Sequence, residues 1–289
     1  MKKNKANLYP LWVTFPAVGL FTLLFIMPMI CGVYLSMTNW DFELDTMSFI
    51  GLKNYFEVFK DKHYIESILH NIVFAVSIII LRNVFAMFLA VSLTKPLKTK
   101  NFLRTVYYLP SILSYIVVGI LFTALLRTNG LVNETLGVLH IPAVDWLGDG
   151  KLALLSVIFL DVWMWTGFHM IIYIAGLQAI PAEYKEASMV DGASAWQYYV
   201  HITLPMMAPS LRISATISVL GGFRVFEQVF VLTGGGPGYS TTTISLMVYR
   251  TFSSGMFGKA TAMEMALSLF IFVMSILISK FFAKREVEL

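Results

Sequence analysis

Long apolar segments alternate with short polar segments along this chain of 289 residues. A helix needs roughly 20 mainly apolar residues to cross the ~30 Å hydrocarbon core of a bilayer. The segments that satisfy this condition are 11–37, 69–93, 105–126, 152–177, 205–232 and 261–282. The fifth is the least continuous, because Arg212, Arg224 and Glu227 interrupt it. The pattern predicts an all-α polytopic membrane protein with six transmembrane helices, forming a single domain over residues 1–289.

Composition supports a membrane protein. Hydrophobic residues make up 57% of the chain and charged residues only 13%. Soluble domains carry about a quarter charged residues, so this chain has too little polar surface for a water-facing exterior. The net charge of +4 does not indicate nucleic-acid binding, because the basic residues are scattered at the ends of apolar segments. The single cysteine, Cys31, excludes a disulfide within the chain.

The first ten residues, MKKNKANLYP, resemble the basic region of a signal peptide. The apolar run that follows, 11–37, is too long for a signal peptide and lacks a clear small-residue cleavage site. We therefore expect this run to be retained as the first span.

Basic residues gather at some span ends and not at others, and cytoplasmic loops carry the excess of Lys and Arg. They lie near the N-terminus, in the second loop and near the C-terminus: Lys2, Lys3, Lys5, Lys95, Lys98, Lys100, Arg104, Lys280, Lys284 and Arg285. The first loop is instead rich in acidic residues: Asp41, Glu43, Asp45, Glu57, Asp61 and Glu66. The third loop carries only Arg127 and Lys151. This distribution predicts that both termini are cytoplasmic, and that residues 180–204 are cytoplasmic too.

Residues 180–204 form a polar, amphipathic segment between two apolar runs. Pro181 suits the first turn of a helix, and Glu186 lies near the positive end of that helix. Gly192 can end the helix in a left-handed conformation, and residues 193–199 can resume it with an aromatic face. This periodicity fits either a helix lying on the membrane surface or an element that docks onto another protein.

The spacing of residues in this segment resembles the EAA motif of permease subunits in binding-protein-dependent ABC importers. That motif reads E-A-A, three residues, G, nine residues, I-x-L-P. The chain has Glu186-Ala187-Ser188, then Asp191-Gly192, then Ile202-Thr203-Leu204-Pro205. Ser188 replaces the second alanine, and its small hydroxyl is compatible with close packing.

Further signatures extend the resemblance over nearly the whole chain. Trp40-Asp41 with FIGLKNY at 49–55 is similar to the first periplasmic loop of sugar permeases, and AGLQAIP at 175–181 to the lead into their coupling loop. VLTGGGPG at 231–238, followed by Thr241-Thr242, is similar to the segment after their fifth core helix. These features favour the subunit type of the first maltose-transporter permease over its partner type.

The resemblance implies a type I ABC importer transmembrane fold in the cytoplasmic membrane of a bacterium or archaeon. The chain would be one permease subunit of an ATP-driven importer that moves a carbohydrate, specifically an oligosaccharide, by alternating access. Its implied partners are a second homologous permease, two ATPase subunits that bind ATP and Mg²⁺, and an extracytoplasmic solute-binding protein. The residues that would couple to an ATPase subunit are Glu186, Ala187, Ser188, Asp191, Gly192, Leu204 and Pro205.

The residues do not indicate an enzyme or a cofactor site in this chain. Gly234–Gly238 is not followed by Lys-Ser/Thr, so it does not match the phosphate-binding loop of nucleotide-binding proteins. It is more typical of a flexible periplasmic turn. The histidines show no metal-ligand spacing: His63, His70, His140, His169 and His201. No Ser–His–Asp set can be assembled on one side of the membrane, so we predict no catalytic or metal site.

The fourth apolar segment carries a candidate substrate site. Ionisable groups inside spans are costly and are functional candidates by default. Asp161, Trp165 and Phe168 share one helix face, with Met164 beside them. A carboxylate can accept sugar hydroxyl groups, and aromatic rings can stack on pyranose rings. The alternative is that Asp161 pairs with a neighbouring span while the aromatic rings fill helix contacts.

The resemblance adds to this candidate site. When the chain is aligned without gaps to the maltose-type relative, these positions coincide with the helix face that contacts sugar there. The same alignment implies a substrate-binding role for Ser218 and Gly222 on the fifth span. Gly222 has no side chain to bond a sugar, so its implied contribution is space for a larger substrate.

Other ionisable residues leave alternatives open. Arg224 and Glu227 are three residues apart and can pair on one helix face, although Arg224 could instead hold an acidic sugar. Arg82 could snorkel, pair with the partner permease or line the pathway, and the sequence assigns it no role. Another cargo, such as glycerol phosphate or a polyamine, remains open, as does a secondary transporter.

Overall fold

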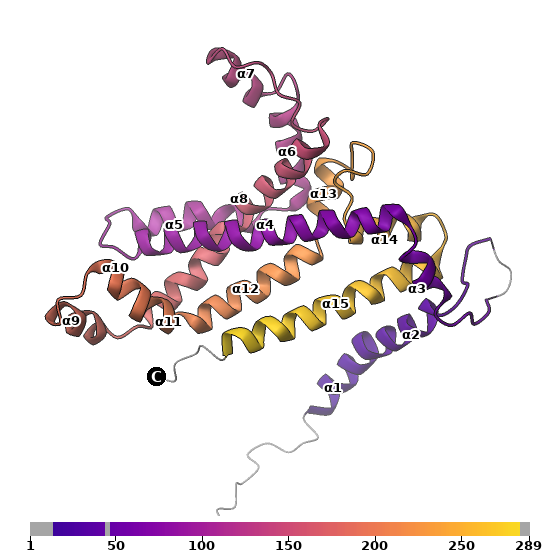
Figure 1. The fold of residues 1–289 in the computed structure, drawn as a ribbon, viewed down its shortest axis with the longest axis horizontal. Coiled ribbons are helices and arrows are strands. Elements are labelled where there is room, and N and C mark those ends of the chain that lie inside the picture. The colour runs from indigo at the N-terminus through magenta and orange to yellow at the C-terminus, as the bar shows by residue number, and fades with distance from the viewer. Residues whose placement is uncertain (1–13, 44–46, 284–289) are drawn as a thin grey trace, which may run out of the picture. The chain divides into compact units, whose positions relative to one another are not determined.

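The computed structural model describes residues 14–43 and 47–283. Several residues used to predict the orientation lie outside this description: Lys2, Lys3, Lys5, Asp45, Lys284 and Arg285. The chain folds into helices (Figure 1), and an isolated antiparallel bridge joins Thr38 to Phe49. The helices group into two compact units, and each unit is described by itself.

The first unit comprises Met1–Phe59 and Val248–Ala266. Its helices are α1 (Phe15–Phe21), a π-helical turn (Thr22–Ile26), α2 (Met27–Ser36) and α3 (Lys53–Val58). The first three run together as one apolar helical segment, Phe15–Ser36. This segment coincides with the predicted first span, and its crossing of the membrane stays a prediction. Helices α14 (Ile244–Ser253) and α15 (Phe257–Ala283) each contain a boundary between the units.

The loop after α2 is tied down by Asn54, whose side chain is buried. Its Nδ2 donates to the carbonyl oxygens of Ser36 and Thr38, both at 2.8 Å. The Ile50 amide donates to the Met37 carbonyl at 2.8 Å, and the Gly258 amide donates to the Trp40 carbonyl at 2.9 Å. The sequence that resembled a permease loop thus builds an ordered connection in which a buried side chain satisfies backbone carbonyls.

The second unit comprises Lys60–Met247 and Leu267–Leu289. It begins with α4 (Lys62–Leu93), α5 (Lys100–Tyr108), a 3₁₀ turn (Leu109–Ile112), α6 (Tyr115–Leu126) and α7 (Leu131–Val138). It continues with α8 (Gly150–Gln178), α9 (Ala182–Val190), α10 (Ala195–Tyr198) and a π-helical turn (Tyr199–Thr203). It then passes through α11 (Leu204–Met206), α12 (Ala208–Phe223) and α13 (Glu227–Leu232).

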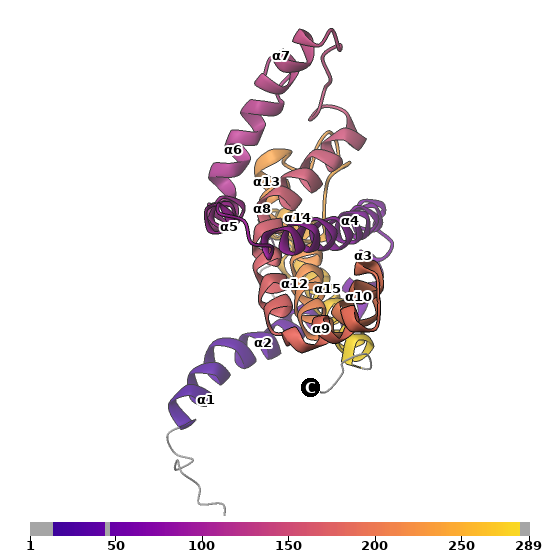
Figure 2. The same cartoon turned by 90° about the vertical axis from the view of Figure 1, so that its left-hand side faces the viewer.

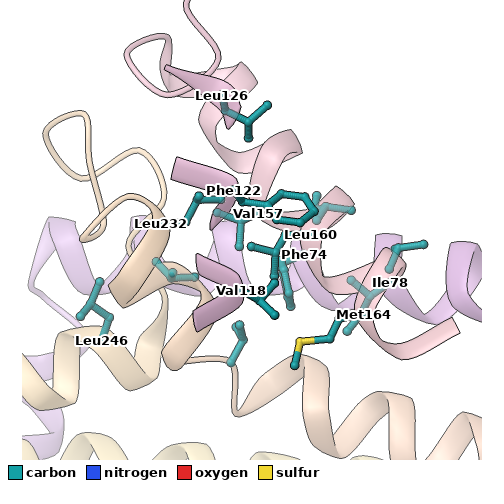
Figure 3. Close-up of a cluster of buried hydrophobic side chains, with 14 residues drawn as sticks. Phe74, Ile78, Val118, Phe122, Leu126, Val157, Leu160, Met164, Leu232 and Leu246 are labelled. Atoms are coloured by element: carbon teal, nitrogen blue, oxygen red, sulfur yellow. The ribbon is translucent and has the colours of Figure 1, made fainter. Parts of the chain in front are cut away.

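Helix α8 is the centre of this unit, and α4, α5, α12 and α13 pack against it. In its most apolar stretch 67% of the residues are buried, against 28% for α4. One core cluster joins Phe74 and Ile78 of α4 to Leu160 and Met164 of α8 (Figure 3). A second cluster, nearer the C-terminal end of α8, contains Ala86, Ala90, Leu93, Met170, Tyr173, Ile174 and Met207. Since α8 is surrounded by protein, polar side chains on it must find partners inside the chain.

Within the described residues, five helices are long and apolar enough to cross a membrane: Phe15–Ser36, Lys62–Leu93, Tyr115–Val138, Gly150–Gln178 and Phe257–Phe281. The predicted third span, 105–126, is interrupted by the 3₁₀ turn and resumes at Tyr115. Pro110 lies in that turn, where its missing amide donor disfavours a continuous α-helix. The third predicted span therefore contains a break that its apolar pattern did not reveal.

The predicted fifth span, 205–232, is not one continuous helix, and this part of the prediction is wrong. The chain breaks at Met207 and again between Phe223 and Glu227, so that the longest piece, α12, has 16 residues. Pro205 and Pro209 lie next to the first break, where they remove backbone donors. The number of crossings and the cytoplasmic position of both termini stay predictions.

Candidate coupling segment and buried polar site

Residues 180–204 form the predicted pair of short helices around a glycine. Helix α9 ends at Val190, and Gly192 adopts a positive φ of 70°, which is favourable only for glycine. The next helix starts with a capping box: the Ser194 amide donates to Gln197 Oε1 at 2.8 Å, and the Gln197 amide donates to Ser194 Oγ at 3.3 Å. The helix–glycine–helix prediction is confirmed.

The side chains of this segment are largely exposed. Glu186 and Ala187 are exposed, whereas Ser188 is buried and its Oγ donates to the Lys185 carbonyl at 2.7 Å. The serine in place of alanine therefore satisfies its own hydroxyl locally. Val190 is 87% exposed and Trp196 is 72% exposed. Large apolar side chains left open on a polar segment are typical of an interaction surface.

The segment is joined to the fifth span by unbroken helical backbone. Residues 195–206 pass without interruption from α10 through the π-helical turn to α11. Leu204 is 38% exposed and Pro205 is half-buried. Partial burial raises the pKa of the Tyr199 phenol, so this ring stays uncharged near neutral pH. Met207 then separates this helical stretch from α12.

The segment and the loop before α8 lie at opposite ends of that helix (Figures 1 and 2). At the N-terminal end of α8, Asn133 holds the preceding loop in place through hydrogen bonds. Its Nδ2 donates to the Val144 carbonyl at 2.9 Å, and its Oδ1 accepts from the Val144 amide at 3.0 Å and from Trp146 Nε1 at 3.2 Å. Asn133 lies in the sequon-like Asn133-Glu134-Thr135 and is buried.

Asp161 is fully buried in the middle of α8. Its Oδ1 accepts a hydrogen bond from Arg82 Nη2 of α4, and the two side chains form an ion pair. Its Oδ2 accepts from Gln228 Nε2 of α13 at 2.8 Å. Of the two roles that the sequence left open for Asp161, the structure contains the pairing with a neighbouring helix. It also places Arg82, for which the sequence gave no role.

Trp165 and Phe168 are half-buried and in edge-to-face contact, with ring centroids 5.5 Å apart. Trp165 Nε1 donates to the Tyr115 hydroxyl at 2.5 Å. The Arg82 guanidinium carbon lies 5.9 Å from the centroid of the Trp165 ring, within the range of a cation–π contact. Among the residues predicted to bind substrate, Trp165 and Phe168 are the two whose side chains are partly exposed.

The other predicted site residues are taken up by helix packing. Met164 belongs to the apolar core. Ser218 is fully buried and its Oγ accepts from Asn83 Nδ2 at 3.3 Å. A Cβ atom on Gly222 would lie 3.0 Å from both Cα and Cβ of Ala75. The space beside Gly222 is therefore filled by α4, which corrects the expectation that it is open to a substrate.

The structure also shows a buried polar group that the sequence analysis missed. Asn83 Oδ1 accepts from the Tyr173 hydroxyl and from Ser214 Oγ, the latter at 2.6 Å. His169 Nδ1 and Ser214 Oγ form a hydrogen bond of 2.7 Å. The available signal was a set of polar residues inside apolar spans, with Asn83 next to Arg82. What the sequence did not contain was the register that brings three helices together.

Arg224 and Glu227 do not share a helix. Helix α12 ends at Phe223 and α13 begins at Glu227, and both charged side chains are exposed. Among the ion pairs of the described residues, none joins these two. The prediction that they pair along one face is wrong, because the break in the span changes their spacing.

The glycine-rich stretch forms a turn that is closed by hydrogen bonds. Gly234, Gly235 and Gly238 all have positive φ values, of 59°, 90° and 60°. Thr241 Oγ1 donates to the Gly236 carbonyl at 2.9 Å, and Thr242 Oγ1 donates to the Gly235 carbonyl at 3.0 Å. The two threonines after the glycines therefore close the turn.

An all-helical fold with several membrane-length helices, and with buried polar contacts at the middle of α8, is that of a polytopic membrane protein. Residues 82–285 match the family described as "Binding-protein-dependent transport system inner membrane component". The chain belongs to this family and is a permease subunit of an ABC importer in the cytoplasmic membrane.

Known permease proteins are similar to this chain over nearly its full length. The chain is 33% identical to the probable ABC transporter permease protein YurN of Bacillus subtilis, covering 99% of each chain. It is 32% identical to the probable starch degradation products transport system permease protein AmyD of Thermoanaerobacterium thermosulfurigenes, covering 91% of this chain and 90% of that protein. A bacterial ABC transporter that imports the acidic polysaccharide alginate has the same fold, with a TM-score of 0.82, 23% identity and 94% of each chain covered.

Proposed function

We propose that this permease moves a carbohydrate, specifically an oligosaccharide, and that ATP hydrolysis on separate ATPase subunits drives the transport. The observation that carries the proposal is the pair of partly exposed rings, Trp165 and Phe168, on the central helix α8. Aromatic faces are suited to stack on pyranose rings. The relative named for starch degradation products supports the same class of cargo.

Residues 180–204 are proposed to receive an ATPase subunit. The segment exposes Glu186 for an ion pair and Val190 and Trp196 for apolar contact. Ala187 and Ser188 are small enough for a close approach, and Gly192 sets the angle between the two helices. Exposed apolar side chains that a partner can bury, with a charge beside them, are typical of protein interfaces.

The proposed mechanism is alternating access. Closure of the ATPase dimer would displace α9 and α10, and the helical backbone of residues 195–206 would carry this displacement to the break at Met207, after which α12 begins. Helix α12 packs against α4 and α8, so its movement would change the packing around Trp165. A second permease would complete the pathway, and a solute-binding protein would deliver the cargo at the opposite end of α8.

Reconstitution into lipid vesicles tests this function. The permease pair, the ATPase subunits and the solute-binding protein are combined, and uptake of labelled maltotriose is compared with uptake of glycerol phosphate and of a polyamine. We expect uptake of the oligosaccharide that requires ATP on the ATPase side. Preferred uptake of either other solute would overturn the cargo. Uptake that persists without ATPase subunits and follows a proton gradient would overturn the coupling.

A further inference from the structure

Both carboxylate oxygens of Asp161 are occupied by side chains of this chain. Arg82 of α4 binds Oδ1 and Gln228 of α13 binds Oδ2. Asp161 is fully buried, and Arg82 and Gln228 are 3% and 4% exposed. Because Asp161 is fully buried, a sugar hydroxyl could reach this carboxylate only if the surrounding side chains moved. We call these three residues the Asp161 clasp.

We call Trp165 and Phe168, the two rings proposed to stack on sugar, the aromatic platform, and the clasp extends to Trp165. Arg82, which pairs with Asp161, also lies over the Trp165 ring at 5.9 Å. Trp165 in turn donates to the Tyr115 hydroxyl of α6 at 2.5 Å. A connected set of contacts thus joins α13, α8, α4 and α6 at the middle of the unit. Arg82 thus contacts one face of the Trp165 indole, and Tyr115 contacts its N–H edge.

Simple packing does not require a clasp of this kind. An ion pair inside an apolar span is costly in free energy. Replacing such a pair by well-packed apolar residues commonly leaves the protein as stable as before. The clasp also has hydrogen-bonding capacity left over: Arg82 Nε and Gln228 Oε1 are buried and have no hydrogen-bond partner within the described part of the chain. Buried polar atoms without partners call for a reason other than stability.

The clasp also holds the piece of the broken fifth span that follows the second break. Helix α13 has only six residues, too few to be stable alone. It packs against α6 and α8, and Gln228 supplies its polar tie to α8. Loss of that tie would weaken the attachment of α13 to α8 without removing any side chain from the aromatic platform.

We propose that Arg82 and Gln228 are positioning residues for transport, which hold Asp161 so that it fixes α13 to α8 and sets the Trp165 ring. Asp161 then acts through the packing of these helices and is not a ligand of the sugar. This inference rests on the proposed function. The two hypotheses for Asp161 differ in what they expect when Gln228 is removed and Oδ2 loses its partner. If Asp161 acts through the clasp, transport is harmed. If Asp161 binds the sugar directly, transport stays intact or improves.

The test uses the reconstituted complex with three variants. Gln228→Leu leaves the Arg82–Asp161 pair in place and removes only the tie to α13. The double variant Arg82→Met, Asp161→Leu replaces the pair by apolar side chains of similar size. Thr243→Val is the matched control, because it removes one buried hydrogen bond, from Thr243 Oγ1 to the Val225 carbonyl at 3.0 Å, outside the clasp. Each is measured for recovery of the complex, basal ATPase activity, ATPase stimulation by loaded binding protein, and uptake.

We expect Gln228→Leu and the double variant to assemble and keep basal ATPase activity, while uptake and stimulated ATPase fall about tenfold. The concentration of binding protein for half-maximal stimulation should stay unchanged, because the clasp does not touch that protein. Uptake by Gln228→Leu equal to that of Thr243→Val would overturn the proposal. If Gln228→Leu is not recovered, wild-type uptake by the double variant would overturn it equally. Failure of the unmodified complex to take up sugar would instead reject the proposed function.

Discussion

Arg82 and Asp161 lie 79 positions apart in the sequence and form a buried ion pair between α4 and α8. The pair is placed in the middle of the second unit, where the aromatic platform and the short helix α13 also meet. It connects an arginine to which the sequence assigned no role with a residue that the sequence proposed as a sugar ligand, and Gln228, which the sequence analysis did not single out, completes the contact. Its presence changes the most direct interpretation of Asp161 from an open ligand to a side chain with two internal partners.

Breaking this pair should destabilise the protein strongly. Asp161→Ala leaves Arg82 buried without a counter-charge, and we expect the free energy of unfolding to fall by about 3–5 kcal/mol. Thermal unfolding of the purified permease in detergent measures this change. Lys53→Met is the control, because it breaks an exposed pair with Glu57 at 3.8 Å and should cost less than about 1 kcal/mol. Equal losses in the two variants would contradict the buried pair.

Gly167 marks a close approach of two helices. A Cβ atom there would lie 1.8 Å from the Tyr107 carbonyl oxygen of α5, so α5 would have to move away from α8. We expect Gly167→Ala to abolish recovery of folded protein. The matched control is Gly137→Ala in α7, where nothing lies within 4 Å of the added Cβ and alanine should favour the helix by up to about 1 kcal/mol. Size-exclusion profiles of the two variants provide the measurement, and normal recovery of Gly167→Ala would show that α5 does not pack there.

Charge reversal on the coupling segment should detach the ATPase subunits from the permease. Glu186→Lys changes an exposed side chain, so its stability should stay within about 0.5 kcal/mol of the original protein. We expect loss of copurified ATPase subunits and of uptake. Glu183→Lys, also exposed on α9, is the matched control. Unchanged ATPase association in Glu186→Lys, or equal loss in both variants, would argue against a specific contact at Glu186.

Removing the aromatic platform should reduce transport without preventing assembly. Trp165→Ala and Phe168→Ala each remove a half-buried ring, and loss of one stacking contact should lower the uptake rate by about tenfold. The control is Trp163→Ala on the same helix, whose 39% exposed ring packs against Phe122 at 5.3 Å. Uptake assays with equal amounts of complex decide the outcome. A larger loss of uptake in Trp163→Ala would move the substrate site to another face of α8.

The sequence by itself determined the class of the protein, because apolar length and low charge content are local properties that a bilayer requires. It also determined the helix–glycine–helix segment at 180–204, since Gly192, Ser194 and Gln197 act on their own neighbours. The tertiary structure decided what local patterns cannot contain. It placed the breaks at Leu109–Ile112 and after Phe223, and it closed the space beside Gly222. It brought Arg82 and Gln228 to Asp161, because the partner of a buried charge depends on how distant helices pack, and their register cannot be obtained from one sequence.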